Sequence, residues 1–417
     1  MTIEQKSTRR SFLKTAGMAA AAMPLFTARS YGRIARSNER FNVGIIGCGG
    51  MATEHLTALL RMQDAVNVAA VSDVFESRAR HFQDLIWKVG GQADRFVDYR
   101  RLLDLKDLDY VLIATPGHWH ARNTLDALDA GLHVYVEKPM THKTEEAFAV
   151  VDKVKATGRK LQVGVQGMSD DSYSSAHEAV KAGKLGPVIE AQIDYVRRYT
   201  TLGPWRSGVD PNLPKPDDLD WEAWIGPAPK RAWSPVRYFE WRNYRDYSGG
   251  IATDLFIHRL TRILRAVGLG IPDRVVGMGG IYLWDDGRDL PDNMEMLVEY
   301  PAIEGITPGM TLHILGTMGN GRPNDHVIRG NDATLLFTRT GWDIIDPAGT
   351  VVEQHQKTGA EDVTLHHQNL HAAIRDNEPL KCDAHMGLYG VVAVNGANDS
   401  WFEKKMMNWD SSGDRWV

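Results

Sequence analysis

The sequence is poor in cysteine, has no long apolar run and carries no excess of positive charge. Its two cysteines, Cys48 and Cys382, could pair only with each other, and a cross-link at Cys48 would obstruct the glycine-rich turn around it. We therefore expect two unpaired thiols. That excludes a disulfide-stapled scaffold, and it leaves the cellular compartment undecided.

The charge balance excludes a second class of protein. The 417 residues include 48 lysines and arginines against 53 aspartates and glutamates, which gives a formal net charge of −5. No overall positive field would draw such a chain to nucleic acid or to anionic lipid. Hydrophobic residues make up 43% of the chain and charged residues 24%, the balance of an ordinary soluble protein. We therefore expect a small polar ligand, no nucleic acid and no stable membrane insertion.

The most apolar stretch lies close to the start of the chain, at residues 16–26. It is far shorter than the roughly 20 residues that span a bilayer, and it follows the basic segment S-T-R-R-S-F-L-K, which contains Arg9 and Arg10. A basic start, a short apolar stretch and then small residues are typical of a bacterial export signal, and paired arginines indicate the twin-arginine route. We predict a signal peptide and linker at 1–36, export by the twin-arginine translocation machinery and a periplasmic location. The alternative, a basic amphipathic helix of the mature domain, would be interrupted by Pro24.

Apolar strands alternate with amphipathic helices from residue 42 to residue 165. Short, fully apolar strands separated by helices indicate a parallel sheet that is covered on both faces, the doubly wound or Rossmann arrangement. We therefore predict an α/β fold with a dinucleotide-binding Rossmann domain at 37–166. Its strands are expected at 43–46, 66–72, 110–114, 133–136 and 161–165, and its helices at 51–62, 75–88, 119–130 and 143–157.

The pattern changes after residue 170. A helix near 172–183 and a strand near 188–199 precede several β-like runs between 275 and 352, whose spacing suits an antiparallel sheet. Further helices are expected from Gly250 and near 363–376 and 384–404. The second domain, 167–417, is therefore predicted to be α+β with an open, mostly antiparallel sheet.

A Pro- and Trp-rich stretch, residues 200–247, interrupts this second domain. Aromatic faces stack on the C–H faces of sugars, so its tryptophans could form part of a sugar site. They could instead pin a long loop to its own domain or to a neighbouring subunit, and we favour pinning for most of them. The tryptophans are Trp205, Trp221, Trp224, Trp233 and Trp241.

A dinucleotide site is indicated by the segment V-G-I-I-G-C-G-G-M-A, residues 43–52, which reads as a strand, G-x-G-x-x-A and then a helix. Gly47 allows a tight turn, Gly49 lets the backbone approach a pyrophosphate, and Ala52 permits close packing of the helix against the strand. The N-terminus of the helix offers free N–H groups to the anion. The residues expected to contact the cofactor here are Gly47, Cys48, Gly49, Gly50 and Met51.

Asp73 ends the second strand, where its carboxylate could accept hydrogen bonds from the hydroxyls of the adenosine ribose. A carboxylate at this point repels a 2′-phosphate, which favours NAD over NADP. Arg78 and Arg80 lie nearby in the sequence and keep NADP as the alternative.

Thr115 and Pro116 follow the fourth strand at its C-terminal end, the edge of such a sheet where ligands bind, and His120 begins the next helix. We expect these three residues, which follow the strand predicted at 110–114, to line the cofactor. His118 and His120 could be mistaken for metal ligands, but no cysteine or paired carboxylate accompanies them. The same holds for a second cluster, His366, His367 and His371. We therefore predict no metal site.

Glu137-Lys138-Pro139, directly after the strand predicted at 133–136, completes a recognisable set of motifs. G-x-G-x-x-A, a strand-end aspartate, A-T-P-x-x-x-H and E-K-P, in this order, resemble the glucose–fructose oxidoreductase / inositol dehydrogenase family (Gfo/Idh/MocA). The segment G-G-I-A-T-D-L-F-I-H at 249–258 looks like that family's G-G-x-x-x-D-x-x-x-H helix, so the resemblance covers most of residues 41–405. It implies an NAD(P)-dependent oxidoreductase of sugar or polyol hydroxyls, with Glu137 and Lys138 beside the cofactor. It also implies a homo-oligomer formed through the open face of the second sheet.

The resemblance assigns the catalytic roles to Lys138, Asp254 and His258, and the chemistry of these residues suits the assignment. Asp254 and His258 are four apart on a predicted helix and so share one face. Oxidation of an alcohol sends a hydride to the nicotinamide while a proton leaves the oxygen, and an imidazole with an ordinary pKa of about 6.5 can accept that proton. Lys138 can stabilise the developing negative charge, and Asp254 can orient the substrate or Lys138.

One stretch departs from the family pattern. Many relatives carry a basic residue beside the glutamine that follows the strand predicted at 161–165, whereas this chain has Gln166-Gly167-Met168-Ser169. Contacts made from that position in relatives are therefore in doubt here, and so is any substrate inferred from them.

Export adds a constraint, because no pool of free NAD can be assumed outside the inner membrane. We therefore expect a tightly bound cofactor that is regenerated in place, by oxidation of one substrate and reduction of another. Alternatively, transient oxidation of a sugar could acidify the neighbouring C–H and cleave a glycosidic bond, which would make the protein an NAD-dependent glycoside hydrolase or lyase. A third interpretation is a non-catalytic exported binding protein with a vestigial dinucleotide fold. The intact Lys138, Asp254 and His258 argue against that one.

Overall fold

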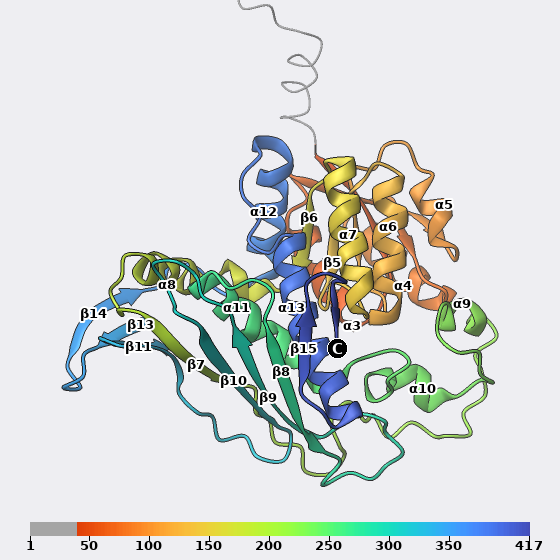
Figure 1. Ribbon diagram of the computed structural model, residues 1–417. Coiled ribbons are helices and arrows are strands. Elements are labelled where there is room, and N and C mark those ends of the chain that lie inside the picture. Colours follow the sequence, from red (N-terminus) through yellow and green to blue (C-terminus); the bar gives the residue numbers. More distant parts are fainter. Residues whose placement is uncertain (1–39) are drawn as a thin grey trace, which may run out of the picture. The chain divides into compact units, whose positions relative to one another are not determined.

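The computed structural model describes residues 40–417, so the predicted export signal at 1–36 lies outside the described residues. The first part of the described chain builds a six-stranded parallel sheet in the order β3-β2-β1-β4-β5-β6 (Figure 1). The strand order reverses between β1 and β4, the kind of switch point at which doubly wound folds bind ligands. The predicted Rossmann arrangement is confirmed. Its strands are β1 (Phe41–Ile46), β2 (Val66–Ser72), β3 (Asp94–Phe96), β4 (Tyr110–Ile113), β5 (His133–Glu137) and β6 (Leu161–Gly164).

Strand β3 is the one strand of this sheet that the sequence analysis missed. It has only three residues, D-R-F, and these are exposed or half-buried. It pairs in parallel with the end of β2 at the edge of the sheet. Because buried strands are predicted from apolar runs, an edge strand of this length gives no signal.

Helices cover both faces of the parallel sheet. Successive side chains of a strand point to opposite faces, so each strand packs against helices on both sides. On β4, Tyr110 and Leu112 pack in one cluster with residues of α3 and α4. Val111 and Ile113 pack in another cluster with residues of α5, α6 and α7. The helices are α3 (Gly50–Arg61), α4 (Glu76–Lys88), α5 (Tyr99–Leu103), α6 (His120–Asp129) and α7 (Thr144–Thr157), with a short 3₁₀-helix η1 (Gly117–Trp119) before α6 and another, η2 (Gln166–Ser169), after β6.

The second sheet has ten strands in the order β14-β13-β12-β11-β7-β10-β9-β8-β15-β16. Strands β7 and β10 pair in parallel, whereas the other neighbouring pairs are antiparallel. The predicted mostly antiparallel α+β domain is therefore confirmed. Its strands are β7 (Val188–Asp194), β8 (Arg274–Gly280), β9 (Asn293–Tyr300), β10 (Met310–Thr317), β11 (His326–Gly330), β12 (Thr334–Thr338), β13 (Gly341–Ile345), β14 (Val351–Gln356), β15 (Met407–Asp410) and β16 (Arg415–Trp416).

Helices α8 (Ser172–Lys181), α11 (Ile257–Val267) and α13 (Ala384–Glu403) pack on one face of this sheet (Figure 1). Their apolar side chains share a core with inward side chains of the strands, such as Met296 and Ile314. Leu297 and Met278, by contrast, are 50% and 69% exposed, so the opposite face is open. Among residues 40–417, no helix is both long and apolar enough to cross a membrane.

Helix α12 (Val363–Asp376) comes late in the chain but packs against the Rossmann domain (Figure 1). Leu370 of α12 joins the buried cluster of β1 and α3, and Leu388 and Val391 of α13 join the cluster on the other face of the sheet. The C-terminal part of the chain thus contributes to the first core. The limits of 37–166 and 167–417 for the two domains remain a prediction.

Residues 200–247, the tryptophan segment, run from the second domain onto the Rossmann domain. The segment contains α9 (Trp221–Ile225), α10 (Pro235–Phe239) and the 3₁₀-helix η3 (Trp241–Asn243). Trp221 and Trp224 are buried and stack with ring centroids 4.9 Å apart, in a cluster that also takes in Phe75 of the Rossmann domain. The backbone N–H of Asp220 donates to the carbonyl of Val74 at 2.9 Å. These two tryptophans therefore pin the segment, as expected for most of its tryptophans.

Candidate active site

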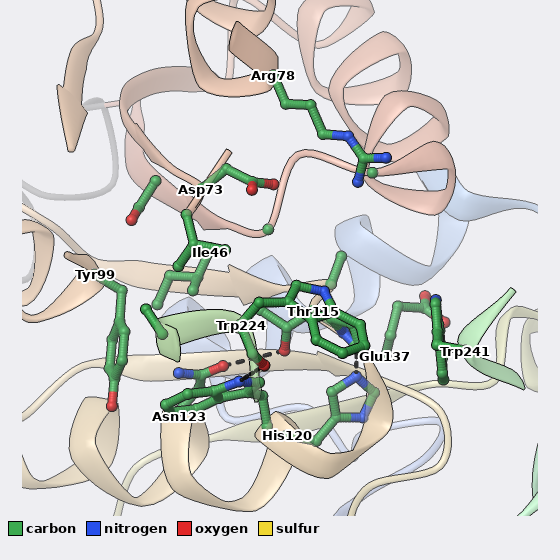
Figure 2. Close-up of a pocket in the computed structure, with 18 of the residues that line it drawn as sticks. Ile46, Asp73, Arg78, Tyr99, Thr115, His120, Asn123, Glu137, Trp224 and Trp241 are labelled. Carbon is green, nitrogen blue, oxygen red and sulfur yellow. Dashed lines mark hydrogen bonds between the residues drawn. The ribbon is translucent and has the colours of Figure 1, made fainter. Parts of the chain in front are cut away.

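A cavity of about 490 Å³ lies along the carboxyl edge of the parallel sheet, next to the reversal of strand order (Figure 2). Its volume suits a small-molecule site. Most of the site residues expected from the sequence line it: Gly47, Gly49, Gly50, Met51, Asp73, Thr115, Pro116, His120, Glu137, Lys138 and Asp254. The other two, Cys48 and His258, are not part of its lining.

The glycine turn between β1 and α3 is shaped by two different steric demands. Gly47 has φ +90°, and a Cβ there would lie 2.8 Å from the backbone nitrogen of Thr115, so only glycine fits. A Cβ on Gly49 would meet no atom within 4 Å, which leaves open space on the cavity side. Helix α3 begins at Gly50 without a side-chain cap, so the free N–H groups of its first turn can bind an anion.

Asp73 and Cys48 are joined across this turn. The Asp73 carboxylate accepts hydrogen bonds from the backbone N–H groups of Cys48 at 2.7 Å and Phe75 at 2.8 Å. Burial raises the pKa of Asp73, and these two hydrogen bonds oppose the shift. The thiol of Cys48 points into the core and donates to the carbonyl of Ser72 at 3.7 Å. Cys48 therefore takes part through its backbone, and both cysteines are unpaired, as expected.

His120 ties together the ends of β4 and β5. Its Nε2 lies 2.8 Å from the carbonyl of Thr115, and its Nδ1 lies 2.6 Å from the carbonyl of Pro139. The hydroxyl of Thr115 is held in turn by the Asn123 side chain at 3.1 Å (Figure 2). The imidazole therefore fixes two cavity-lining loops relative to each other. This supporting role is visible only in the structure.

Lys138 and Asp254 meet inside the cavity. The Lys138 ammonium donates to the Asp254 carboxylate at 2.6 Å and to its backbone carbonyl at 2.9 Å. The second oxygen of the carboxylate pairs with Arg242 Nε at 2.8 Å. Although burial opposes ionisation, the charges of Arg242 and Lys138 hold the pKa of Asp254 well below its usual range. The two domains thus bring an ammonium and a guanidinium onto one ionised carboxylate.

The helix that carries Asp254 differs from the prediction in one respect. Residues Ala252–Phe256 form a π-helical turn, η4, which continues into α11. A plain α-helix was expected, and the wider turn was not visible in the residue spacing. π-Turns are frequent at functional sites because they re-aim a side chain without breaking the helix.

His258 lies one turn beyond Asp254, on α11. Its ring is partly buried, and among residues 40–417 its Nδ1 has no hydrogen-bond partner. Burial lowers the pKa of His258 well below the ordinary value, and the charges of Lys138 and Arg262 lower it further. His258 is therefore a neutral imidazole within the electrostatic reach of Lys138, although it does not itself line the cavity.

The loop at Gln166-Gly167, where the sequence departs from the family pattern, lies against an arginine of α11. A Cβ on Gly167 would lie 1.7 Å from Nη2 of Arg262, so glycine makes room for the guanidinium of Arg262. Arg262 pairs with Glu361 at 2.7 Å, and its Nε has no partner within the described part of the chain. A cation thus does lie beside this loop, but it comes from α11. Sequence reasoning could not find this cation, because Gly167 and Arg262 are far apart in the chain.

The tryptophan segment forms one wall of the cavity, so Trp224 and Trp241 lie where the less favoured interpretation, a part in the ligand site, would place them. The residues that it contributes to the lining are Asp220, Ala223, Trp224, Tyr238, Phe239, Trp241 and Arg242. The carbonyl of Trp224 accepts hydrogen bonds from Trp119 Nε1 at 2.8 Å and from His118 Nε2 at 3.0 Å, so this wall is fixed to the loop after β4. Within the described chain, no group of three or more His, Cys, Asp or Glu side chains is placed to hold a metal ion.

Two family profiles match the chain. The profile of an oxidoreductase family with an NAD-binding Rossmann fold (Gfo/Idh/MocA) matches residues 41–165. The profile of that family's C-terminal α/β domain matches residues 173–268, and the two together match more than half of the chain. The chain belongs to this oxidoreductase family. The predicted family is confirmed, whereas twin-arginine export remains a prediction.

Individual relatives differ in how much of the chain they match. The inositol 2-dehydrogenase 4 of Saccharopolyspora erythraea is 33% identical over 151 residues, which cover 36% of this chain and 44% of the relative. The chain thus matches less than half the length of this curated relative. Among solved structures, levoglucosan dehydrogenase in complex with NADH has a TM-score of 0.66 at 17% identity, with 89% of this chain and 99% of that chain covered. The aldose–aldose oxidoreductase of Caulobacter crescentus, complexed with glycerol, has a TM-score of 0.66 at 18% identity over 89% of this chain and 100% of that chain. Both structures share the fold.

Proposed function

We propose that the protein is an NAD-dependent dehydrogenase that acts on a hydroxyl group of a sugar or polyol. The observation that carries the proposal is the position of Lys138, whose ammonium lies 2.6 Å from the Asp254 carboxylate in the same cavity as the glycine turn and Asp73. Membership of an oxidoreductase family supports the reaction type. The substrate class is supported by the relatives, which are an inositol dehydrogenase and a levoglucosan dehydrogenase.

The residues of the cavity fit a dinucleotide. The open space at Gly49 and the uncapped start of α3 would hold the pyrophosphate, and Asp73 would hold the adenosine ribose, which leaves Lys138 for the nicotinamide side. When bound, the nicotinamide supplies the hydride acceptor. The Asp73 carboxylate would repel a 2′-phosphate, so we propose NAD as the cofactor, although Arg78 also lines the cavity.

The proposed chemistry divides the work between two side chains. An ammonium has three N–H donors, and Asp254 occupies two of those of Lys138. The third can donate to the substrate oxygen and stabilise its negative charge as the hydride leaves carbon. His258, kept neutral by its lowered pKa, is the proposed acceptor of the hydroxyl proton.

We further propose that the cofactor stays bound and is recycled in place. The tryptophan segment supports this, because it walls the cavity and is fastened at several points. Asp218 accepts a hydrogen bond from the backbone N–H of Ser77 at 2.8 Å. Arg206 pairs with Glu240 at 2.6 Å and with Asp286 at 2.7 Å. We propose that release of the dinucleotide requires some of these contacts to break. Nucleotide released by denaturing the purified protein tests the idea, and protein free of NAD(H) would reject it.

Activity is tested with NAD⁺ and a panel of polyols and aldoses that begins with myo-inositol. The absorbance of reduced nicotinamide is followed in the wild type and in Lys138→Met, which keeps a side chain of similar length without the charge. We expect reduction with at least one compound in the wild type and none in the variant. Equal rates in both proteins, or no reduction with any compound, would reject the proposal. Cleavage of aryl glycosides at catalytic amounts of NAD, without net reduction, would favour a glycosidase instead.

Location and assembly extend the proposal. We propose a periplasmic protein exported by the twin-arginine route, which a fusion of residues 1–36 to a folded reporter would test. We also propose self-association through the open face of the second sheet, where Leu297 and Met278 are exposed. Light scattering of the wild type and of Leu297→Glu tests this, and a monomeric wild type would reject it.

A further inference from the structure

A chain of buried ionisable side chains runs from the cavity through the Rossmann domain to α12. Glu137, which lines the cavity, has Oε1 2.8 Å from His55 Nε2 on α3. His55 Nδ1 lies 2.9 Å from His367 Nε2 on α12. His367 Nδ1 lies 3.3 Å from the hydroxyl of Tyr110 on β4, and that hydroxyl lies 3.1 Å from His371 Nε2 on α12. Four consecutive hydrogen-bond distances therefore connect five side chains.

The positions of the protons follow from the carboxylate at one end. Burial opposes ionisation of Glu137, but the hydrogen bond from His55 lowers its pKa, so Glu137 is a carboxylate and can only accept. His55 then carries its proton on Nε2, which leaves Nδ1 to accept from His367 Nε2. His367 Nδ1 accepts from the hydroxyl of Tyr110, which in turn accepts from His371 Nε2. Every donor in the chain points toward Glu137.

The neutral state of the imidazoles agrees with this assignment. Burial lowers the pKa of His371 to about 4 and that of His367 well below its ordinary value. A neutral imidazole has one N–H and one lone pair, as each link requires.

Solvent exposure differs among these five side chains. His55, His367 and Tyr110 have no exposed surface, whereas His371 retains 6%. The end away from the cavity is therefore the one nearest to solvent. Burying ionisable groups is costly unless every group is paired. Apolar side chains could pack α12 onto the sheet without that cost, so packing alone does not account for this row of ionisable side chains.

We propose that Glu137, His55, His367, Tyr110 and His371 conduct protons between the cavity and solvent. A proton that binds His371 Nδ1 lets its Nε2 proton pass to Tyr110, whose own proton passes to His367 Nδ1. The Nε2 proton of His367 then passes to His55 Nδ1, and the Nε2 proton of His55 passes to Glu137. One proton enters, one arrives at the carboxylate, and no electrons move. Afterwards every donor points away from Glu137, which is the arrangement that conducts a proton outward.

This inference rests on the proposed function and adds the route of the proton. Oxidation of a hydroxyl leaves one proton in the cavity, and reduction of a carbonyl consumes one. A cofactor recycled in place alternates these two reactions, so protons cross outward and inward in turn. Because the direction of the hydrogen bonds reverses with each passage, the imidazoles need no reorientation between passages, and only the carboxyl group of Glu137 turns to exchange its proton with the cavity.

The proposed proton route can be tested without a substrate. Tyr135 provides a matched control for Tyr110. Both tyrosines are fully buried on neighbouring strands. The hydroxyl of Tyr135 accepts a hydrogen bond at 3.2 Å from the amide of Gln166, which also donates to Glu137 at 2.6 Å, so it meets the five side chains through an amide that does not pass protons on. In ¹⁵N-histidine NMR of the wild type, His55, His367 and His371 should each carry the proton on Nε2. The N–H of His55 should exchange with water faster than the backbone amides of α3, since no local unfolding is needed.

Tyr110→Phe should slow this exchange by about tenfold, roughly the factor that corresponds to one lost hydrogen bond, and Tyr135→Phe should leave it unchanged. Equal exchange in the two variants overturns the proposal, as does a proton on Nδ1 of any of the three histidines. Circular dichroism checks that both variants fold, and His371→Leu replaces Tyr110→Phe with the same expectation if that variant does not.

Turnover gives a second readout. A pH-indicator dye reports the proton in solvent while absorbance reports reduced nicotinamide. Tyr110→Phe should delay the dye signal relative to the absorbance, and Tyr135→Phe should not. Simultaneous signals in Tyr110→Phe overturn the proposal. A wild type without dehydrogenase activity, but with Tyr110-dependent exchange of the His55 proton, would reject the proposed function and retain the conducting chain.

Discussion

Gly49 offers a substitution that separates cofactor binding from folding. Its backbone has φ −90° and ψ −166°, which alanine can adopt, and an added Cβ meets no protein atom within 4 Å. Replacing a helix N-cap glycine by alanine costs roughly 0.5 kcal/mol, and the loss of unfolded-chain entropy returns a similar amount. Gly49→Ala should therefore change the free energy of unfolding by less than about 1 kcal/mol.

The same methyl group would stand in the space assigned to the pyrophosphate. Overfilling a packed contact by one methyl group costs about 1–3 kcal/mol. Because about 1.4 kcal/mol corresponds to a tenfold change in affinity, NADH binding should weaken by roughly 5-fold to 150-fold. Gly47→Ala is the contrasting variant, since its Cβ would collide with the backbone at Thr115 and its φ is +90°. Strain and overpacking together should cost about 2–6 kcal/mol of stability.

Urea unfolding followed by circular dichroism measures the stability of both variants. Binding is measured from tryptophan fluorescence, because Trp119, Trp224 and Trp241 line the cavity and would transfer energy to bound NADH. Wild-type affinity in a normally folded Gly49→Ala would refute the placement of the pyrophosphate. Stability lost to the same extent in the two variants would refute the steric argument.

Three further predictions concern the chemistry, the buried histidines and the wall of the cavity. Lys138→Met should abolish hydride transfer while NADH still quenches tryptophan fluorescence, and a variant that still transfers hydride would remove Lys138 from the mechanism. Burial lowers the pKa of His118 to about 3 and those of His366 and His371 to about 4. Between pH 6.5 and about 4 these rings therefore bind protons mainly in the unfolded state. The free energy of unfolding should fall as the pH drops through this window. A free energy of unfolding that stays constant there would contradict the burial of these histidines. Arg206→Met leaves the buried Glu240 without its cation, so it should cost about 3–5 kcal/mol and speed the loss of bound cofactor. The exposed pair of Lys230 and Glu222 is the control, where Lys230→Met should cost less than about 1 kcal/mol.

Local signals made much of this protein predictable. The buried parallel strands are apolar runs, and the glycines of the turn at Gly47 belong to the recurring G-x-G-x-x-A motif. Lys138 and Asp254 were expected in one site because their motifs matched a family, and the structure joins them at 2.6 Å. Each of these features depends on a few adjacent residues or on a recurring motif.

Features that depend on contacts between distant segments were not predictable. Arg242 reaches Asp254 from the tryptophan segment, and Arg262 fills the space beside Gly167 from α11. The sequence analysis considered His367 only as a member of a cluster that binds no metal, and its full burial against His55 could not be foreseen from the sequence. No periodicity or spacing in the sequence encodes which distant segments will pack together.

The most direct test of the central claim is an experimental structure of the protein with NADH bound. We predict that the pyrophosphate contacts the start of α3 at Gly49, that the adenosine ribose lies at Asp73 and that the nicotinamide ring lies beside Lys138. A dinucleotide bound in the opposite direction, or outside this cavity, would contradict the account.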